Sequence, residues 1–362
     1  MKPPTLDDLR RYAIARSLFK PMTLQKAITR LGFVQADPIR APARAQDLTL
    51  LHRVANYRAG DLERRYPRLP IEEDFFINYG FMPRELHALM HPRTARKSWT
   101  KARWKKAHEV LEFVRAHGVV HPRAVDAHFA HGKVTNWFGG SSNASTQLLD
   151  GMHYRGLLRV ARREGGIRLY AVREAHEAPL GVAETMDRLL DVVVNKYAPL
   201  PARTLSRCAY FLALAVPQWR HARKDALARA KSRLPNVTVG GHTWYWPAGE
   251  DPRSRRHRML DEVRLFSPFD PVVWDRDRFE TFWGWPYRFE AYTPAPKRVR
   301  GYYALPLMWR DSVIGWGNLA VVDGKLVPLL GYVRGRAPKD AAFKQALEAE
   351  LARIEIFLGG TK

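Results

Sequence analysis

The stretch KARWKKAHEVLEFVRAH, residues 101–117, is the part of the chain from which the fold class is predicted first. Its apolar residues recur at helical spacing, and Gly118 directly after it is typical of a helix end. Two shorter helices and a β-hairpin are predicted next: residues 121–129, residues 141–156, and the runs 157–160 and 167–172 around the turn sequence RREGG. Three helices followed by a basic hairpin are typical of a winged helix, whose third helix enters a DNA groove.

Looser copies of this pattern are predicted on both sides of that module. The later copy covers residues 183–246, with helices 183–194, 201–214 and 218–234 and a hairpin at 237–246. The N-terminal copy has helices 6–19, 23–31 and 45–54, with a strand at 33–36. Residues 263–327 indicate a small β-rich domain, and residues 339–357 predict a closing amphipathic helix.

The predicted fold class is therefore α+β, with three tandem winged-helix modules, a C-terminal β-rich domain and a terminal helix. The predicted boundaries are residues 1–92 for the first module, 93–176 for the second, 177–249 for the third and 250–362 for the β-rich domain with its closing helix.

The charge of the chain indicates what kind of partner it has. Lys and Arg number 60 against 36 Asp and Glu, so the 362 residues carry a formal net charge of +24. Because 46% of the residues are apolar, the chain can bury a core, which excludes a disordered basic tail. So large a positive charge favours a polyanionic partner, with nucleic acid ahead of an anionic membrane surface.

Cysteine usage and apolar runs bear on the compartment. Cys208 is the single cysteine, which excludes an intramolecular disulfide and a cysteine-built zinc site. The opening MKPPTLDDL lacks the apolar core of a signal peptide, and the longest apolar run, residues 208–216, is far shorter than the ~20 residues that span a bilayer. We therefore expect a cytoplasmic protein without a membrane span.

The segment FVQADP, residues 33–38, contains the most suggestive pair of polar side chains. In a strand, Gln35 and Asp37 point to the same side. An amide can orient a water molecule, while a neighbouring carboxylate accepts its proton or stabilises positive charge that develops in the transition state. This pair suits hydrolysis of an N-glycosidic bond, and a cationic leaving base would need no general acid. The plainer interpretation is that Asp37 ends a strand and caps the next turn.

Two longer blocks show a family resemblance. VQADPIRAPARAQDLTLLHRV, residues 34–54, resembles the signature of the YcaQ family of crosslink-repair DNA glycosylases, which are AlkZ-like and winged-helix, and in which a Gln-x-Gln or Gln-x-Asp motif carries the activity. The block from Leu265 to Trp309, with SPFD, YRFEAYTP and GYYALP, resembles the C-terminal block of the same family. The sequence departs from the family pattern at Gln46-Asp47, where many relatives have a His-rich stretch, and at residues 315–318.

The resemblance implies an open, C-shaped arrangement of winged helices that holds double-stranded DNA with alkylated or crosslinked purines. It assigns catalysis to Gln35 and Asp37, and it implies a monomer in the bacterial cytoplasm, associated with the nucleoid, without a cofactor or a metal. No lysine lies between Gly32 and Tyr57, so a Schiff-base lyase step has no obvious nucleophile there. We expect both motif side chains to lie in an open, electropositive cleft.

Contacts to DNA are predicted on the basic and small polar residues of the modules and of the segment after them. These residues are Arg40, Arg44, Lys133, Ser142, Asn143, Gln147, Arg162, Arg163, His242, Arg255 and Arg256. Ser142 or Asn143 is also the expected N-cap of the third helix in the middle module.

The sequence predicts a monofunctional DNA glycosylase that hydrolyses the N-glycosidic bond of N7-alkylpurine nucleotides and unhooks interstrand crosslinks. The alternative is a non-catalytic winged-helix transcriptional regulator, which the charge and the helices fit equally well. A metal-dependent nuclease is a weaker interpretation, because arginines alternate with the carboxylates of the late acidic segment, Asp270 to Glu280.

Overall fold

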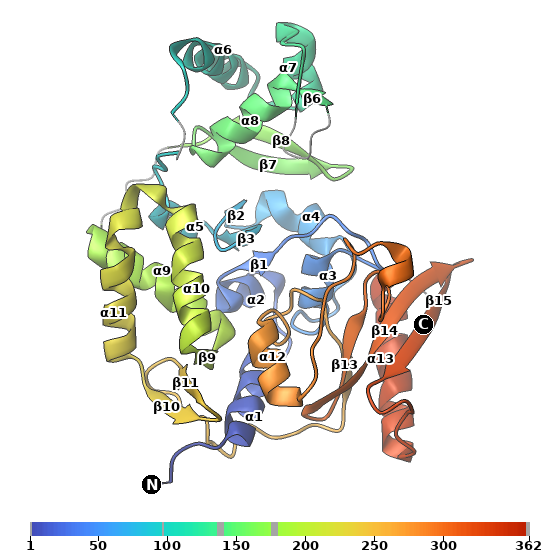
Figure 1. Cartoon of the computed structure of the whole chain (residues 1–362). Coiled ribbons are helices and arrows are strands. Elements are labelled where there is room, and N and C mark those ends of the chain that lie inside the picture. Colours follow the sequence, from blue (N-terminus) through green and yellow to red (C-terminus); the bar gives the residue numbers. More distant parts are fainter. Residues whose placement is uncertain (1, 96–97, 136–140, 175–179, 360–362) are drawn as a thin grey trace.

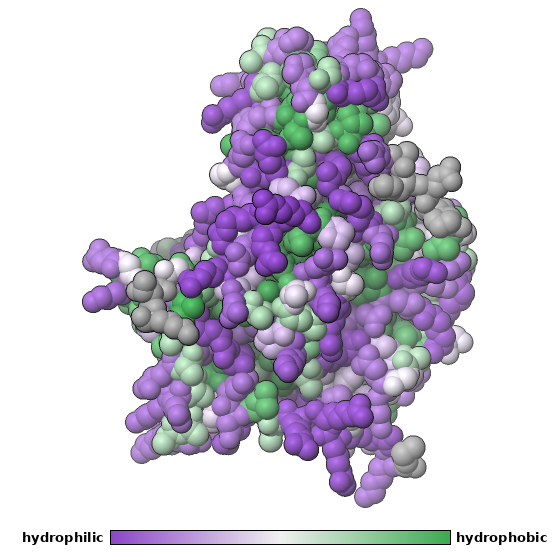
Figure 2. All heavy atoms as spheres, turned by 180° about the vertical axis from the view of Figure 1, so that it is seen from behind, coloured by the Kyte–Doolittle hydropathy of each residue, from purple (hydrophilic) through white to green (hydrophobic). Residues whose placement is uncertain are grey.

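The computed structural model describes residues 2–95, 98–135, 141–174 and 180–359. Residues 101–172 form a lobe that projects from a larger body, and that body holds both the N-terminal and the C-terminal elements (Figure 1). Seen from behind, hydrophilic side chains cover most of the surface, with smaller hydrophobic patches between them (Figure 2). In the described part of the chain, no helix is both long and apolar enough to cross a membrane.

The N-terminal part folds into short helices around a small antiparallel sheet. Its elements are α1 (Leu6–Ser17), α2 (Leu24–Leu31), β1 (Val34–Gln35), α3 (Ala45–Leu51), α4 (Asp61–Arg65), the 3-10 helix η1 (Tyr66–Arg68), β2 (Ile71–Phe75), β3 (Tyr79–Pro83) and α5 (Arg84–Leu89). The strand order is β1-β3-β2. The predicted helices and the first strand are present, whereas the hairpin of β2 and β3 was not predicted.

The projecting lobe contains the elements expected of the middle module. They are α6 (Lys101–His117), β4 (Val119–Val120), α7 (Pro122–Phe129), β5 (Lys133–Thr135), β6 (Ser141–Asn143), α8 (Ala144–Tyr154), β7 (Leu158–Glu164) and β8 (Ile167–Val172). The predicted start of the third helix at residue 141 is wrong, because residues 141–143 pair with β5. Asn143 occupies the N-cap position, but its side chain accepts no hydrogen bond from the described helix; its amide instead donates to Asp126 at 2.7 Å.

The next part is mostly helical and ends in a tight hairpin. Its elements are α9 (Val182–Tyr197), β9 (Leu200–Pro201), α10 (Ala202–Ala215), the 3-10 helix η2 (Pro217–Ala222), α11 (Arg223–Arg233), β10 (Asn236–Val239) and β11 (His242–Tyr245). The predicted helix 218–234 is therefore α-helical only from Arg223, because the backbone at Trp219 leaves the helical region. The predicted turn at Gly240-Gly241 is confirmed, and both glycines have positive φ.

The C-terminal part is built on a four-stranded antiparallel sheet in the order β12-β13-β14-β15. Its elements are β12 (Val263–Leu265), α12 (Arg276–Trp283), the 3-10 helix η3 (Ala295–Lys297), β13 (Leu305–Trp309), β14 (Ser312–Val322), β15 (Lys325–Tyr332) and α13 (Ala341–Leu358). The ring of Phe343 on α13 packs against Trp309 of the sheet. The helix α12, capped by Asp275, is an exception to the predicted β-rich character.

The mixture of helices and strands agrees with the predicted α+β class. One continuous cluster of buried apolar side chains joins the N-terminal part, the lobe and the C-terminal sheet; among its members are Leu48, Val160 and Leu307. The assignment of three winged helices and the four domain boundaries stay predictions.

Candidate active site

The strand β1 lies at the edge of the N-terminal sheet, and a glycine fixes how closely it approaches its neighbour. Gln35 pairs directly with Gly80 of β3. A Cβ atom at Gly80 would lie 2.2 Å from the Val34 carbonyl oxygen and 2.7 Å from the Phe33 ring. A side chain at residue 80 would therefore push β1 away from the sheet. Gly80 thus helps to hold the Gln-x-Asp motif in place.

Gln35 and Asp37 line the same cavity, which has a volume of about 520 Å³. Gln35 is only 5% exposed, and its Oε1 has no hydrogen-bond partner among the described residues. The strand ends at Gln35, earlier than predicted, although the Ala36 N–H still donates to the Tyr79 carbonyl at 2.9 Å. The expected meeting of the two side chains at one cavity is confirmed, while their catalytic roles stay predictions.

Asp37 is held by its own loop and has no basic partner. Its Oδ1 accepts a hydrogen bond from the Ile39 N–H at 2.9 Å, and its own N–H donates to Gln46 Oε1 at 3.2 Å. No arginine, lysine or histidine among the described residues lies within ion-pair distance of this carboxylate. Burial therefore raises the pKa of Asp37, and the bond from Ile39 opposes that rise only partly.

Aromatic side chains from the C-terminal part of the chain form another part of the cavity wall. Phe269 and Phe289 lie with their ring centroids 5.4 Å apart, and Tyr292 packs edge-on against Phe289 at 5.9 Å. Tyr292 is 82% exposed. A surface of this kind can stack a nucleobase, and its negative ring faces attract a cation.

Two arginines line the cavity, and both are already paired with glutamates. Arg44 forms an ion pair with Glu63, whose other oxygen accepts the Gly166 N–H at 3.1 Å. Arg163 forms an ion pair with the buried Glu73. These bonds fasten the turn of the β7–β8 hairpin to the N-terminal part, so the positive charge at this cavity is largely compensated.

Glu73 also connects to the cavity wall through Tyr79. The Tyr79 hydroxyl donates to Glu73 Oε1 at 2.6 Å. Burial alone would raise the pKa of Glu73, but the hydrogen bond and charge of Arg163, with Tyr79, outweigh it and hold this pKa below its usual value. Glu73 is therefore a fixed anion that orients Tyr79 and Arg163 at the cavity.

Most of the other predicted DNA contacts lie away from the cavity. Arg40 is exposed on the loop after Asp37, and Arg162 is exposed beside Glu164. The remainder are distributed over the lobe, the β10–β11 hairpin and the segment before β12: Lys133, Asn143, Gln147, His242, Arg255 and Arg256. The side chain of Ser142 lies outside the described part of the structure. Contact with DNA stays a prediction for all of them.

One group of described side chains could converge on a metal ion. Ligand atoms of Asp74, His87 and His91 lie within 4.8 Å of one another, and all three residues are buried. Arg93 Nη1, however, lies 3.0 Å from Asp74 Oδ1 and places a permanent positive charge beside that point. The group is therefore better described as a hydrogen-bonded ion-pair network than as a cation site.

The late acidic segment does not gather carboxylates around one point either. Asp270 is bound by Arg53, with both side chains fully buried. Asp275 accepts from Arg207 at 2.9 Å and from Thr204. These two carboxylates are therefore neutralised by arginines distant in sequence, and no described ion pair joins them to the arginines that alternate with them.

The structure brings a lysine close to Phe33, the residue directly before β1. Lys196 is buried, contacts the Phe33 carbonyl oxygen, and lines a different cavity. Burial lowers the pKa of Lys196 to about 7. No lysine is among the described residues that line the cavity of Gln35 and Asp37.

Several residues of this site were not predicted. Gln46 lies at one of the two places where the sequence departs from the family pattern. That departure is the sequence feature that could have indicated Gln46 as a site residue. Phe269, Phe289 and Tyr292 lie inside the recognised C-terminal block, which had not been connected to the motif. Tyr79 carried no signal, because its strand was not predicted.

Comparison with known proteins identifies the family of the chain. The profile of the family described as "DNA glycosylase AlkZ-like" matches residues 28–357, which is most of the chain. The chain therefore belongs to the AlkZ-like DNA glycosylase family, and an enzyme acting on DNA is the class of protein that follows.

A solved structure shows the same fold. The Streptomyces sahachiroi DNA glycosylase AlkZ superposes with a TM-score of 0.66 and 15% sequence identity, over 100% of this chain and 98% of that one. The family resemblance seen in the sequence is thus confirmed.

Proposed function

We propose that this DNA glycosylase hydrolyses the N-glycosidic bond of N7-alkylated purines in double-stranded DNA. The observation that carries the proposal is the joint presence, in one cavity, of the unpartnered Gln35 Oε1 and the unpaired Asp37 carboxylate. A water molecule can donate one proton to each of these oxygens and so be held for attack. The carboxylate is also placed to stabilise an oxocarbenium-like transition state.

The cavity wall is suited to a purine that carries a positive charge before the N-glycosidic bond breaks. An N7-alkylated purine carries a positive charge on an aromatic ring, and the rings of Phe269, Phe289 and Tyr292 offer faces that attract such a cation. Because the base leaves as a neutral species once the bond breaks, no general acid is required. The cavity, at about 520 Å³, has the size of a small-molecule site.

Two finer features belong to the same proposal. Because the exposed Tyr292 stands at the cavity, bulky adducts and interstrand crosslinks can approach it without complete extrusion of the base. Because no described lining residue is a lysine, the reaction ends at an abasic site and not at a broken strand. We further expect the protein to act on DNA as a monomer.

The test uses a duplex with a single N7-methylguanine and a second duplex with a nitrogen-mustard crosslink. We expect the wild type to release free base and to leave sites that break only in alkali. Asp37→Asn is expected to lose about 10²- to 10⁴-fold in rate, with duplex binding retained in fluorescence anisotropy. The matched control, Asp225→Asn, makes the same change at an exposed residue of α11 and should match the wild type.

Undiminished base release by Asp37→Asn would reject the mechanism. A wild type that binds duplex but releases no base from either substrate would favour the non-catalytic regulator. Strand breaks without alkali would contradict the monofunctional step and direct attention to Lys196.

A further inference from the structure

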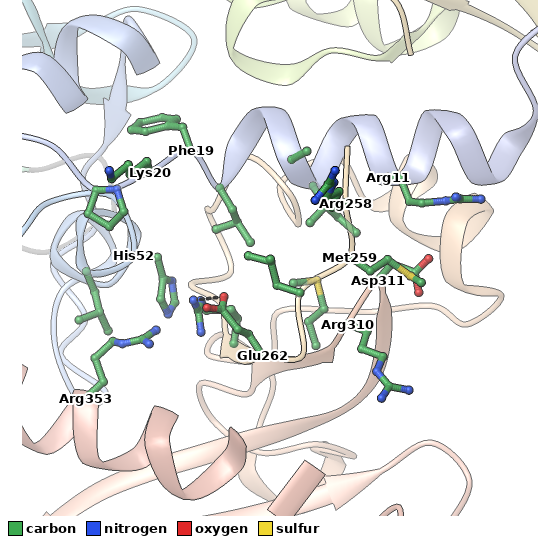
Figure 3. Close-up of a pocket in the computed structure, with 18 residues that line it drawn as sticks. Arg11, Phe19, Lys20, His52, Arg258, Met259, Glu262, Arg310, Asp311 and Arg353 are labelled. Carbon is green, nitrogen blue, oxygen red and sulfur yellow. Dashed lines mark hydrogen bonds and ion pairs between the residues drawn. The ribbon is translucent and has the colours of Figure 1, made fainter. Parts of the chain in front are cut away.

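A second cavity, of about 490 Å³, shares no lining residue with the candidate active site. It lies between the N-terminal helix α1, the end of α3 and the C-terminal part of the chain (Figure 3). In this view the labelled arginines come from four separate segments: Arg11, Arg258, Arg310 and Arg353. A cavity of this size accommodates a small organic molecule.

Positive charge dominates the wall of this second cavity. Its charged lining residues are Arg11, Lys20, Arg258, Arg264, Arg310 and Arg353 against Glu262 and Asp311. Both acidic residues are already paired, Glu262 with Arg264 and Asp311 with Arg10. Arg11, Lys20 and Arg258 make no ion pair with any described residue. A recess with uncompensated cations favours an anion.

The same wall carries apolar surface between the charges. Leu18 and Phe19 line the cavity from the end of α1. Met259 and Leu260, which also line it, are 52% and 59% exposed. Large apolar side chains left exposed in a recess gain burial when the apolar body of a ligand enters.

His52 contributes a hydrogen-bond acceptor that no described residue uses. Its Nε2 lies 2.7 Å from Glu350 Oε1, and both side chains are completely buried. Burial lowers the pKa of His52, so the ring is neutral and donates its Nε2 proton to the carboxylate. Nδ1 then keeps its lone pair, and it has no partner among the described residues.

We propose that this cavity binds a small organic anion that combines an apolar ring body, a phosphate or carboxylate group, and a hydrogen-bond donor. The anionic group lies near Arg11 and Arg258, the ring body covers Met259 and Leu260, and the donor bonds to His52 Nδ1. The proposal does not depend on the reaction at Gln35 and Asp37.

The test is calorimetric titration of the full chain with 6-hydroxy-2-naphthoate, which has all three features. We expect saturable binding of one molecule per chain. We expect weaker binding of 2-naphthoate, which lacks the donor, and of 2-naphthol, which lacks the anion. Sodium phosphate should bind least, because it lacks the ring.

Substitutions in and away from the cavity wall test whether the probe binds in this cavity. Arg258→Glu, on an exposed residue, is expected to weaken binding on the order of tenfold. Leu260→Asp, also exposed, is expected to weaken it comparably by removing apolar surface and adding a negative charge. Arg220→Glu makes the same charge change in η2, away from this cavity, and should leave binding unchanged.

Three results would overturn the proposal. The first is absence of saturable binding. The second is an equal loss in Arg258→Glu and Arg220→Glu, which would mean unspecific attraction to a basic protein. The third is displacement of the probe by undamaged duplex, which would assign these cations to the DNA-binding surface.

Discussion

Two aspartates of the N-terminal sheet have opposite surroundings. Asp74 lies in β2, where it is bound by Arg93 at 3.0 Å, by His91 at 2.8 Å and by His87 at 3.1 Å, with all four side chains buried. Asp37 follows β1, on the other side of β3; its carboxylate accepts one backbone hydrogen bond and forms no ion pair with a described residue.

Their pKa values differ accordingly. Burial alone would raise the pKa of Asp74, but the charge of Arg93 and the hydrogen bonds of His87 and His91 outweigh it and hold this pKa well below its usual value. Burial raises the pKa of Asp37, because no cation opposes it. The difference teaches that a carboxylate saturated by partners serves the fold, whereas one left unsaturated in an open cavity is available to water and to a cationic substrate.

The largest effect is expected for stability when the saturated carboxylate is changed. Asp74→Asn leaves the buried Arg93 without its counter-charge, so the free energy of unfolding should fall by about 3–5 kcal/mol. Urea unfolding followed by circular dichroism measures it. The control, Asp61→Asn, breaks an ion pair with the exposed Arg64 and should cost at most about 1 kcal/mol. Similar losses in both variants would remove the distinction between the two kinds of carboxylate.

The next effect concerns the amide beside Asp37. Gln35→Ala removes the oxygen that orients the water, so base release should slow by roughly 10- to 100-fold while Asp37 still acts. Single-turnover release of N7-methylguanine measures it. Gln218→Ala, which removes an amide bonded to the Met90 and Pro92 carbonyls outside the cavity, should leave the rate unchanged. An unchanged rate in Gln35→Ala would exclude Gln35 from the reaction.

The pH dependence distinguishes the two aspartates, because their pKa values are shifted in opposite directions. Asp37 must be ionised to act, and its pKa is raised, so base release should fall as the pH drops through a value above the ordinary 3.8. Asp74 has a depressed pKa, so its contribution to stability is complete above the unfolded value and is lost only as the pH falls through the lower, folded value. Rate profiles and urea unfolding between pH 3 and pH 8 should therefore show activity lost first, at pH values where the protein is still folded. Simultaneous loss of both would contradict this assignment.

The smallest effect is a gain of stability when the unsaturated carboxylate is neutralised. Asp37→Asn keeps an oxygen for the Ile39 N–H but removes a partly buried charge that has no cation. We expect the free energy of unfolding at neutral pH to rise by less than about 1 kcal/mol, since solvent screens a half-exposed group. Thermal unfolding of Asp37→Asn and of Asp74→Asn measures directly whether each substitution raises or lowers the free energy of unfolding. Destabilisation by Asp37→Asn would show that its carboxylate supports the fold.

The sequence predicted the periodic helices well and missed the sheet that holds the site. The helix at 101–117 has the predicted bounds, because its apolar stripe faces a buried core. The strand β2 reads IEEDF and shows no apolar alternation, yet Glu72, Glu73 and Asp74 are all buried. They are compensated by arginines from other segments, such as Arg159 and Arg163, and a local pattern cannot reveal such partners.

Only part of the candidate site was predicted, because the rest of it also comes from segments that are distant in the sequence. Gln35 and Asp37 stand two residues apart, so their proximity followed from strand geometry and from the family resemblance. The wall of the cavity comes from Tyr79 and from residues more than 200 positions later in the chain, such as Phe289. The ion pairs of Arg44 and Arg163 with glutamates also depend on the folded arrangement, and they reduce the positive charge that was expected at this cleft.

The most direct test of the central claim is the binding of two duplexes that carry abasic-site analogues differing in charge. One has a protonated pyrrolidine, which imitates the oxocarbenium ion, and the other has a neutral tetrahydrofuran. We expect the wild type to prefer the cationic analogue by about tenfold or more, and Asp37→Asn to bind both with nearly equal dissociation constants. A full preference for the cation in Asp37→Asn would contradict the role of this carboxylate.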